Sequence, residues 1–370
     1  MAHLQKIFLF FLLFTLILFS QESFRKEIHV PDILGYKTLK CDFHMHTVFS
    51  DGSVWPDIRV EEAWREGLDC IAITDHIEYQ PHKDDIRRNN NRSYELALSV
   101  AEKFGIMLIR GTEITKSMPP GHFNAIFIKD ANLLDTADFR VAFRLAREQG
   151  SFTVFNHPFW RDPDYPVVDG KVRWMKEHQE LFDAGLFQGI EIVNETSYYP
   201  EAFRWALENN LTILGNSDVH IPVTMFWDYP AGEHRPVNLL FVTEKSPEGV
   251  KDALLSRRTV VYYEDMLFGK EEYLNAIFSK SVTVKKIGIN GKNTFFEVSN
   301  NSSFDYKLSL KEKHPDFNIP DAFTLKKNSK VHITIRNKEN KGTFPLETIF
   351  TVKNLHSAPE KTIDIKLVFE

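Results

Sequence analysis

This chain of 370 residues has few cysteines and only a small excess of negative charge. Its two cysteines are too few for a small domain held together by disulfides. A net charge of −6, with histidine counted as neutral, argues against a chain that is drawn as a whole to nucleic acid. An anionic substrate would therefore have to be attracted by a local cluster of cationic side chains or by bound metal ions.

Long apolar stretches are also scarce, and the most prominent one lies at the N-terminus. Lys6 precedes an apolar run over 7–19 that only Thr15 interrupts, and Ser20 is a small residue suited to cleavage near Gln21. This pattern is typical of an export signal, and about thirteen residues are too few to cross a bilayer about 30 Å thick. We predict a signal peptide over residues 1–21, no stable membrane span after cleavage, and a periplasmic or secreted protein; a retained anchor is the alternative.

Strand-like and helical segments alternate between residues 39 and 265. Helical periodicity appears over 93–104, 139–146 and 202–207, and Ser246-Pro247 is a typical start for a helix over 247–255. This alternation predicts an α/β barrel of parallel strands, with its chemistry at the C-terminal ends of the strands. The strand-like runs, rich in Ile, Val and Phe, are 39–46, 70–76, 106–114, 122–128, 152–157, 189–194, 211–218, 237–242 and 259–263.

The pattern changes near Ser281, beyond which apolar and polar residues alternate and no helical period appears. Turns such as Asn-Gly separate the runs, and the three histidines of this part are scattered. We predict a barrel domain over 22–281 and a small all-β sandwich over 282–370, which we interpret as a packing or binding module. The runs are 282–289, 294–298, 306–310, 330–335, 347–352 and 362–369.

Side chains that favour metal ions recur at or near the ends of the barrel's strand-like runs. His44 and His46 share one face of an extended chain, and Asp51 follows on a turn that contains a glycine. A single histidine is more often a buried, hydrogen-bonded residue than a ligand. Nine metal-type side chains placed where a barrel gathers its active site predict a metal centre: His44, His46, Asp51, His76, Glu113, His122, His157, Asp218 and His220.

The same strand registers bear on the cysteines. If His44 and His46 face into the barrel, Cys41 faces outward, and Cys70 does the same when His76 faces inward. We therefore predict two free, buried thiols.

These residues also carry a family resemblance, which covers about 39–265. The resemblance is to the PHP (polymerase and histidinol phosphatase) family. It implies a distorted seven-stranded (β/α) barrel, two or three divalent metal ions and hydrolysis of phosphoesters. The tract 74–83, with the export signal and the β-rich tail, is similar to the family's exported phosphodiesterases. The motifs are His44-x-His46, Ser50-Asp51-Gly52, Thr74-Asp75-His76, Gly111-x-Glu113, His122, Asn156-His157-Pro158 and Ser217-Asp218-x-His220.

The resemblance also implies how nine ligands would divide among three metal ions. Three dications and three carboxylates leave the site about +3, which would draw an anionic phosphoester into an acidic protein. Mixed imidazole and carboxylate ligands suit Mn, Fe or Zn, and spacing does not choose among them. One ion would bind His44, His46, Glu113 and Asp218; a second would share Glu113 and add His122 and His157; a third would bind Asp51, His76 and His220.

The reaction expected from such a centre is in-line displacement at phosphorus of a small-molecule phosphodiester by a metal-bound hydroxide. The departing alkoxide needs a partner, for which the third metal ion is the simplest candidate and His82 and Asp75 are side-chain candidates. Asn156 either contacts phosphate or satisfies the backbone, and Asp42 either accepts a hydrogen bond from a ligand histidine or serves in a turn. Candidate substrate contacts, which would otherwise be ordinary solvated charges, are Lys83, Arg87, Arg88 and Arg235.

Three other functions compete with this one. A phosphomonoesterase of the same family, like histidinol phosphatase, would use the same metals. A non-catalytic binding protein on a degenerate barrel should have lost ligands, whereas all nine are present. A DNA exonuclease is disfavoured by the export signal and by the lack of a basic stripe. The sequence does not fix the oligomeric state.

Overall fold

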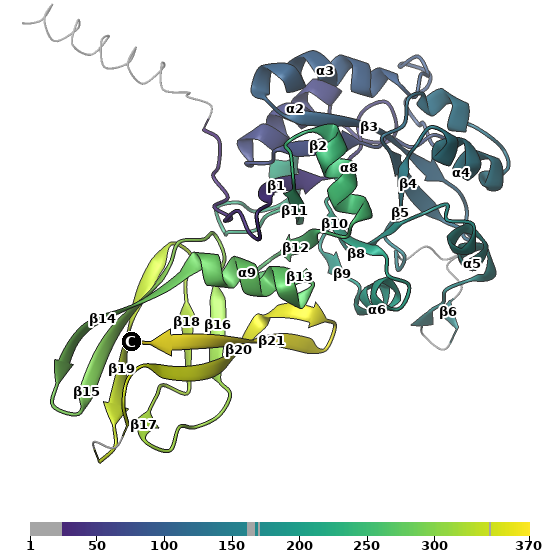
Figure 1. Cartoon of the computed structure of the whole chain (residues 1–370). Coiled ribbons are helices and arrows are strands. Elements are labelled where there is room, and N and C mark those ends of the chain that lie inside the picture. Colours follow the sequence, from purple (N-terminus) through teal and green to yellow (C-terminus); the bar gives the residue numbers. More distant parts are fainter. Residues whose placement is uncertain (1–23, 161–166, 169–170, 340–341) are drawn as a thin grey trace, which may run out of the picture.

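A computed structural model of the chain describes residues 24–160, 167–168, 171–339 and 342–370. The signal peptide expected over 1–21 lies outside the described residues. The chain forms an α/β body followed by an all-β body (Figure 1). Among the helices of the described part, none is long and apolar enough to cross a membrane.

The helices follow the apolar periodicity of the sequence. Helix α3 (Arg92–Phe104) buries Ala97 and Ala101, and it ends at Gly105, whose φ of 66° lies in the left-handed region that glycine adopts without strain. Helix α8 (Pro247–Leu255) starts after Ser246, whose hydroxyl accepts a hydrogen bond from the Gly249 amide. The predicted helices are confirmed here and in α4 (Phe139–Glu148) and α6 (Pro200–Glu208).

The α/β class is confirmed, but the sheet is mixed where the sequence predicted parallel strands. Neighbouring pairs β1–β2, β2–β3, β5–β8 and β8–β10 are parallel, whereas β3–β4, β4–β5 and β1–β11 are antiparallel. Strand β4 reverses because only residues 116–121 separate it from β3, too few for the crossover that a parallel pair needs. The strands, in sheet order, are β10 (Thr212–Asn216), β8 (Gly189–Asn194), β5 (Phe152–Phe155), β4 (His122–Ile126), β3 (Met107–Thr115), β2 (Cys70–Ile73), β1 (Lys37–Asp42), β11 (Val237–Val242) and β12 (Thr259–Tyr263).

The sheet curls until β10, at one end of the sheet order, approaches β11 and β12. The Asn238 side chain donates to the Gly215 carbonyl at 2.8 Å, and the Thr259 hydroxyl donates to the Ile213 carbonyl at 3.0 Å. A Cβ on Gly215 would lie 2.4 Å from Val261 Cγ1, so only glycine permits this approach. Helices α2 (Pro56–Arg65), α3, α4, α6 and α8 surround the curved sheet (Figure 1). The C-terminal ends of the parallel strands, and the N-terminal end of β4, therefore point toward a common mouth.

The all-β body confirms the predicted sandwich. Helix α9 (Glu271–Ser281) leads into it, and Phe296, Phe350 and Phe369 are fully buried between its sheets. Strand β13 (Met266–Gly269) pairs with β20, so the two bodies share a sheet. One layer contains β14 (Val282–Asn290), β15 (Asn293–Asn300), β19 (Ser329–Asn337) and β17 (Phe317–Asn318), and the other contains β16 (Tyr306–Leu310), β18 (Ala322–Leu325), β20 (Leu346–Ala358) and β21 (Lys361–Phe369).

Both cysteines are free and buried, as predicted, and they face each other as register partners on β1 and β2. The remaining elements connect the barrel strands. They are η1 (Ala131–Leu134), β6 (Val167–Val168), β7 (Lys171–Val172), α5 (Lys176–Asp183), β9 (Ser197–Tyr198) and α7 (Val223–Phe226).

Candidate metal centre

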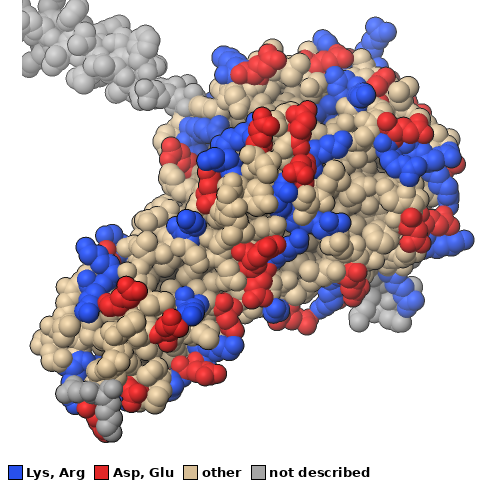
Figure 2. Space-filling view, viewed as in Figure 1, with Lys and Arg blue, Asp and Glu red and all other residues tan. Residues whose placement is uncertain are grey.

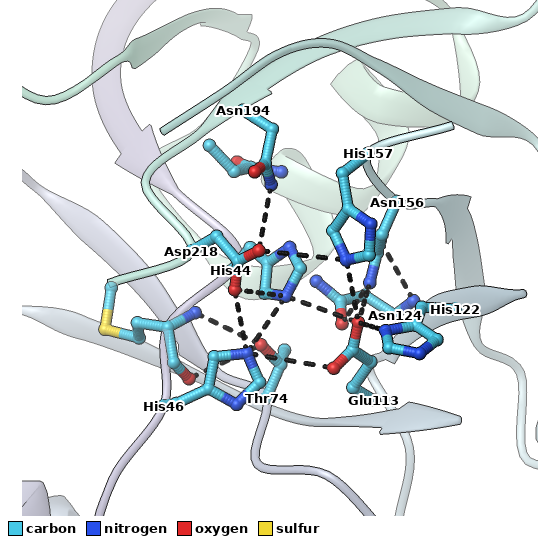
Figure 3. Close-up of polar contacts among 12 residues, drawn as sticks. His44, His46, Thr74, Glu113, His122, Asn124, Asn156, His157, Asn194 and Asp218 are labelled. Atoms are coloured by element: carbon cyan, nitrogen blue, oxygen red, sulfur yellow. Dashed lines mark hydrogen bonds and ion pairs between the residues drawn. The ribbon is translucent and has the colours of Figure 1, made fainter. Parts of the chain in front are cut away.

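The structure brings the nine metal-type residues together at the mouth of the curled sheet. The chain runs beyond β1 through His44 and His46, and Asp218 and His220 follow β10, at the edge that closes toward β11. Figure 3 shows imidazoles and carboxylates from these separate elements pointing toward one another. Four groups have ligand atoms within 4.8 Å of one another: His46, Asp51, His76 and His220; His44, His46 and Asp218; His44, Glu113 and His157; His76, Glu113 and His122.

The first pocket has the dimensions of a coordination sphere. His44 Nε2 and His46 Nε2 lie 3.1 Å apart, and Asp218 Oδ1 is 3.1 Å from the first and 3.0 Å from the second. Glu113 Oε1 is 3.5 Å from His44 Nε2. Donor atoms around a tetrahedral ion at about 2.0–2.1 Å are about 3.3 Å from one another. The residues therefore fit a divalent metal ion.

Buried polar atoms of the centre point to the same conclusion. In the described part of the chain, Asp51 Oδ1, Glu113 Oε2, Asp218 Oδ1 and His122 Nδ1 are among the buried atoms that make no hydrogen bond, although imidazole nitrogens lie beside the carboxylate oxygens. Buried polar groups are nearly always satisfied, and unsatisfied ones at a site of this composition are the atoms that metal ions engage.

Glu113 occupies the middle of the centre and belongs to two of the four groups, as expected for a bridging carboxylate. Burial alone would raise the pKa of Glu113, but the charges of His76, His122 and His44 hold it well below its ordinary value. Burial likewise opposes ionisation of Asp218, yet His44 and His46 hold the pKa of that carboxyl well below its usual range. The centre therefore keeps its carboxylates charged and attracts cations.

Several imidazoles of the centre are held by a neighbour at one ring nitrogen. His44 Nδ1 lies 2.8 Å from Glu191 Oε1, and His76 Nδ1 lies 2.6 Å from Thr115 Oγ1. His220 Nδ1 lies 2.7 Å from the Asp218 carbonyl. Such contacts fix the tautomer and the orientation of a metal-binding imidazole.

Glu191 on β8 is the main site residue that the sequence did not reveal. It is fully buried, and Oε1 accepts from Asn216 Nδ2 at 2.8 Å, while Oε2 accepts from the His157 amide at 2.7 Å and Asn194 Nδ2 at 2.8 Å. The only signal was a glutamate inside an otherwise apolar strand, which without the partners reads as an ordinary polar position.

Two of the tentative catalytic residues have structural partners instead. Both oxygens of Asp75 accept hydrogen bonds: Oδ1 from the Thr47 amide at 2.6 Å and from Ser50 Oγ at 2.8 Å, and Oδ2 from Thr47 Oγ1 at 2.8 Å. Asp75 thus fixes the turn that carries Asp51. The Asn156 side chain donates to Glu113 Oε1 at 2.8 Å, which orients that carboxylate.

Asp42 and Arg235 form a buried ion pair, which argues against a substrate contact for Arg235 and a histidine contact for Asp42. Arg235 Nη1 lies 2.9 Å from Asp42 Oδ2, and Arg235 Nε pairs with Glu66. Asp42 Oδ1 accepts from the amides of His44 and Ser217 and not from an imidazole. A guanidinium that is 2% exposed and held by two carboxylates is not positioned to meet substrate. Asp42 instead supports the backbone below the centre.

The basic side chains of the loop after β2 are mostly exposed to solvent. His82, Lys83 and Arg87 are exposed, and Arg88 pairs with Asp135 at 2.5 Å. Within the described ranges, no hydrogen bond or ion pair joins these four side chains to the metal-type cluster.

Fold and site together define the class of metal-dependent phosphoesterases, and comparisons with known proteins agree. Residues 42–190 match the PHP domain family, and residues 281–368 match an Ig-like domain family. The chain is similar to a two-domain protein of Bacteroides vulgatus, described as containing a predicted PHP-like metal-dependent phosphoesterase. The two are 42% identical, with a TM-score of 0.88 over 93% of this chain and 99% of that one. The chain belongs to the PHP family.

One curated relative matches over a shorter stretch. It is an uncharacterised protein of Methanocaldococcus jannaschii, 37% identical over 84 residues, which are 22% of this chain and 36% of that protein. The resemblance inferred from the motifs is thus confirmed for the family.

Proposed function

We propose that this protein hydrolyses small-molecule phosphodiesters at a centre of two or three metal ions held by the nine clustered residues. The observation that carries the proposal is the position of Glu113, which is fully buried and belongs to two groups of clustered ligand atoms. Mn, Fe or Zn bound there would lower the pKa of a water molecule and polarise the phosphoryl oxygens. The chain's own part is to place the ligands: Asn156 orients Glu113, and Glu191 orients His44.

The surroundings of the centre favour a diester over a monoester. A monoester dianion is best held by extra cationic side chains, yet Arg235 is engaged by two carboxylates and Arg88 by Asp135. Two half-exposed aromatic rings stand beside the ligands instead. Trp160 lies 5.9 Å from His157, and Tyr79 lies 6.0 Å from His76, between ring centroids. Such rings suit the second organic group that a diester carries.

The leaving group remains without an assigned side-chain acid. Asp75 is unsuited because both of its oxygens already accept hydrogen bonds. His82 stays a candidate only if its exposed loop approaches the substrate.

We further propose that the protein is exported and acts on small molecules. Figure 2 shows Lys and Arg interspersed with Asp and Glu over the face drawn, without the basic stripe that a nucleic-acid groove needs. Sequencing the N-terminus of protein recovered from a periplasmic or secreted fraction tests export: a start near residue 22 supports it, and an intact leader refutes cleavage.

The substrate proposal is tested by assaying metal-loaded protein on bis(4-nitrophenyl) phosphate and 4-nitrophenyl phosphate, with the Glu113→Ala variant as the inactive control. We expect kcat/KM for the diester to exceed that for the monoester at least about tenfold, a difference of about 1.4 kcal/mol in transition-state stabilisation. The reverse ratio would establish the phosphatase alternative. No turnover of either with Mn, Fe or Zn would leave a binding protein as the surviving hypothesis.

A further inference from the structure

A cavity of about 270 Å³ lies where the two bodies meet, away from the metal centre. Residues distant in sequence line it: the stretch 26–28 ahead of β1, Glu66 and Leu68 after α2, five residues between 229 and 237, Tyr262 on β12, and residues 303 and 327–328 of the all-β body. Backbone contacts hold these walls together. The His29 amide donates to Ser303 Oγ at 2.9 Å, and the Ser303 amide donates to the His29 carbonyl at 2.9 Å.

Arg235, which lines this cavity, has an unused hydrogen-bonding nitrogen. Its Nη1 and Nε are engaged by Asp42 and Glu66, but Nη2 is buried without a hydrogen-bond partner in the described part of the chain. A guanidinium carries only donors, and a buried charged donor without an acceptor is costly. An oxygen acceptor that reached Nη2 would satisfy it.

Cations outnumber free acids around the same cavity. Lys26 and Lys327 both line it, and neither has an ion-pair partner among the residues that the structure describes. Burial lowers the pKa of Lys26, Glu66 opposes this shift, and the charge of Lys327 adds to it. The acids are already engaged. Glu66 accepts from Tyr229 and Arg235, and Glu27 pairs with His29 at 3.2 Å.

We propose that this cavity between the two bodies binds a small oxyanion of the size of phosphate or sulfate. One oxygen would accept from Arg235 Nη2, and the others would face the ammonium groups of Lys26 and Lys327, an arrangement of charge-assisted hydrogen bonds. The anion would bind segments of both bodies and stabilise their contact. It would also touch the guanidinium that holds Asp42, whose other oxygen accepts from the His44 and Ser217 amides. The site does not depend on the proposed hydrolytic activity.

The test is equilibrium dialysis of radiolabelled inorganic phosphate against full-length protein, first loaded with metal and then treated with chelator. Chelation removes the metal ions as phosphate ligands. Binding that survives chelation and is lost in a variant of the cavity lysines then belongs to this cavity. We compare wild type with Lys26→Ala/Lys327→Ala, and with Lys280→Ala/Lys313→Ala as a charge-matched control on exposed lysines that do not line the cavity.

We expect one phosphate per chain to remain bound after chelation. Its affinity should fall by about tenfold or more in Lys26→Ala/Lys327→Ala and stay within about twofold in the control. A selenate soak of wild-type crystals should give an anomalous peak next to Arg235. The proposal is overturned if binding disappears completely on chelation, if both double variants bind alike, or if the selenium lies elsewhere. A separate assay of diester hydrolysis keeps failure of this site distinct from failure of the enzyme assignment.

Discussion

Replacing Glu191 by glutamine tests how far the ligand histidines depend on a residue that touches no substrate. The carboxylate accepts four hydrogen bonds, from His44 Nδ1, the His157 amide, Asn194 Nδ2 and Asn216 Nδ2, at 2.7–2.8 Å. All four partners are donors. A glutamine in the same place has one accepting oxygen and one NH₂ group, so whichever way its amide is turned, the NH₂ meets a donor pair.

The size of the effect follows from these contacts. Loss of charge-assisted hydrogen bonds costs about 1.5–3 kcal/mol each, and removing a partner behind a ligand typically weakens metal binding by about 10–100-fold. We expect Glu191→Gln to weaken metal binding within that range. The same variant should lower kcat/KM for a phosphodiester at subsaturating metal and recover part of the loss at high metal concentration.

Metal affinity is measured by competition with a chromogenic chelator, with Glu102→Gln as the matched control. Glu102 is exposed on α3, so this variant loses the same charge away from the centre. An unchanged affinity in Glu191→Gln would refute the argument that Glu191 orients His44, and a loss of equal size in the control would show that net charge alone sets the affinity.

Four further predictions follow from the same structure. Glu113→Ala should reduce metal content, measured by plasma mass spectrometry, from two or three ions per chain by at least one, because Glu113 faces two groups of ligand atoms. Chelation should abolish hydrolysis, and added Mn, Fe or Zn should restore it; activity that persists without metal would contradict the assignment. Asp75→Asn should lower the free energy of unfolding by about 1.5–3 kcal/mol without changing the dependence of rate on leaving-group pKa, whereas a proton donor would change that dependence. Arg235→Ala should lower the free energy of unfolding in urea by about 3–5 kcal/mol, because it leaves the buried carboxylates of Asp42 and Glu66 without their cationic partner. Burial already raises the pKa of Glu66. A carboxyl whose pKa is higher in the folded than in the unfolded protein stabilises the fold while it is protonated, and this contribution is lost as pH rises. The deficit of Arg235→Ala should therefore shrink from pH 8 to pH 5, and a deficit that grows would refute the pairing.

Local residue patterns were sufficient to predict the helices and strands that bury one face. Helices α3 and α8 begin and end within a residue or so of their predicted bounds, because a left-handed glycine and a serine cap act on their own turn of chain. Alternation of apolar and polar residues likewise predicted the all-β body, since a strand with one buried face has a period of two.

The prediction of parallel strands was wrong for β4 and β11, because strand pairing is a contact between distant segments. The residues of β4 do not by themselves indicate that the strand runs antiparallel to both neighbours. Its direction follows from the connection after β3, which is too short to carry the chain back to the other end of the sheet.

The sequence by itself determined which residues form the centre, because histidine and carboxylate side chains recur beside strand ends and a barrel gathers those ends. Only the tertiary structure decided the roles of the charged side chains that surround the centre. Asp75, Arg235 and Glu191 have similar polar character in sequence, yet one ties down a turn, one is buried in an ion pair and one orients a ligand. The physical reason is that a charged side chain takes its role from the groups that satisfy it after burial. Most of those groups lie 25 to 193 positions away along the chain.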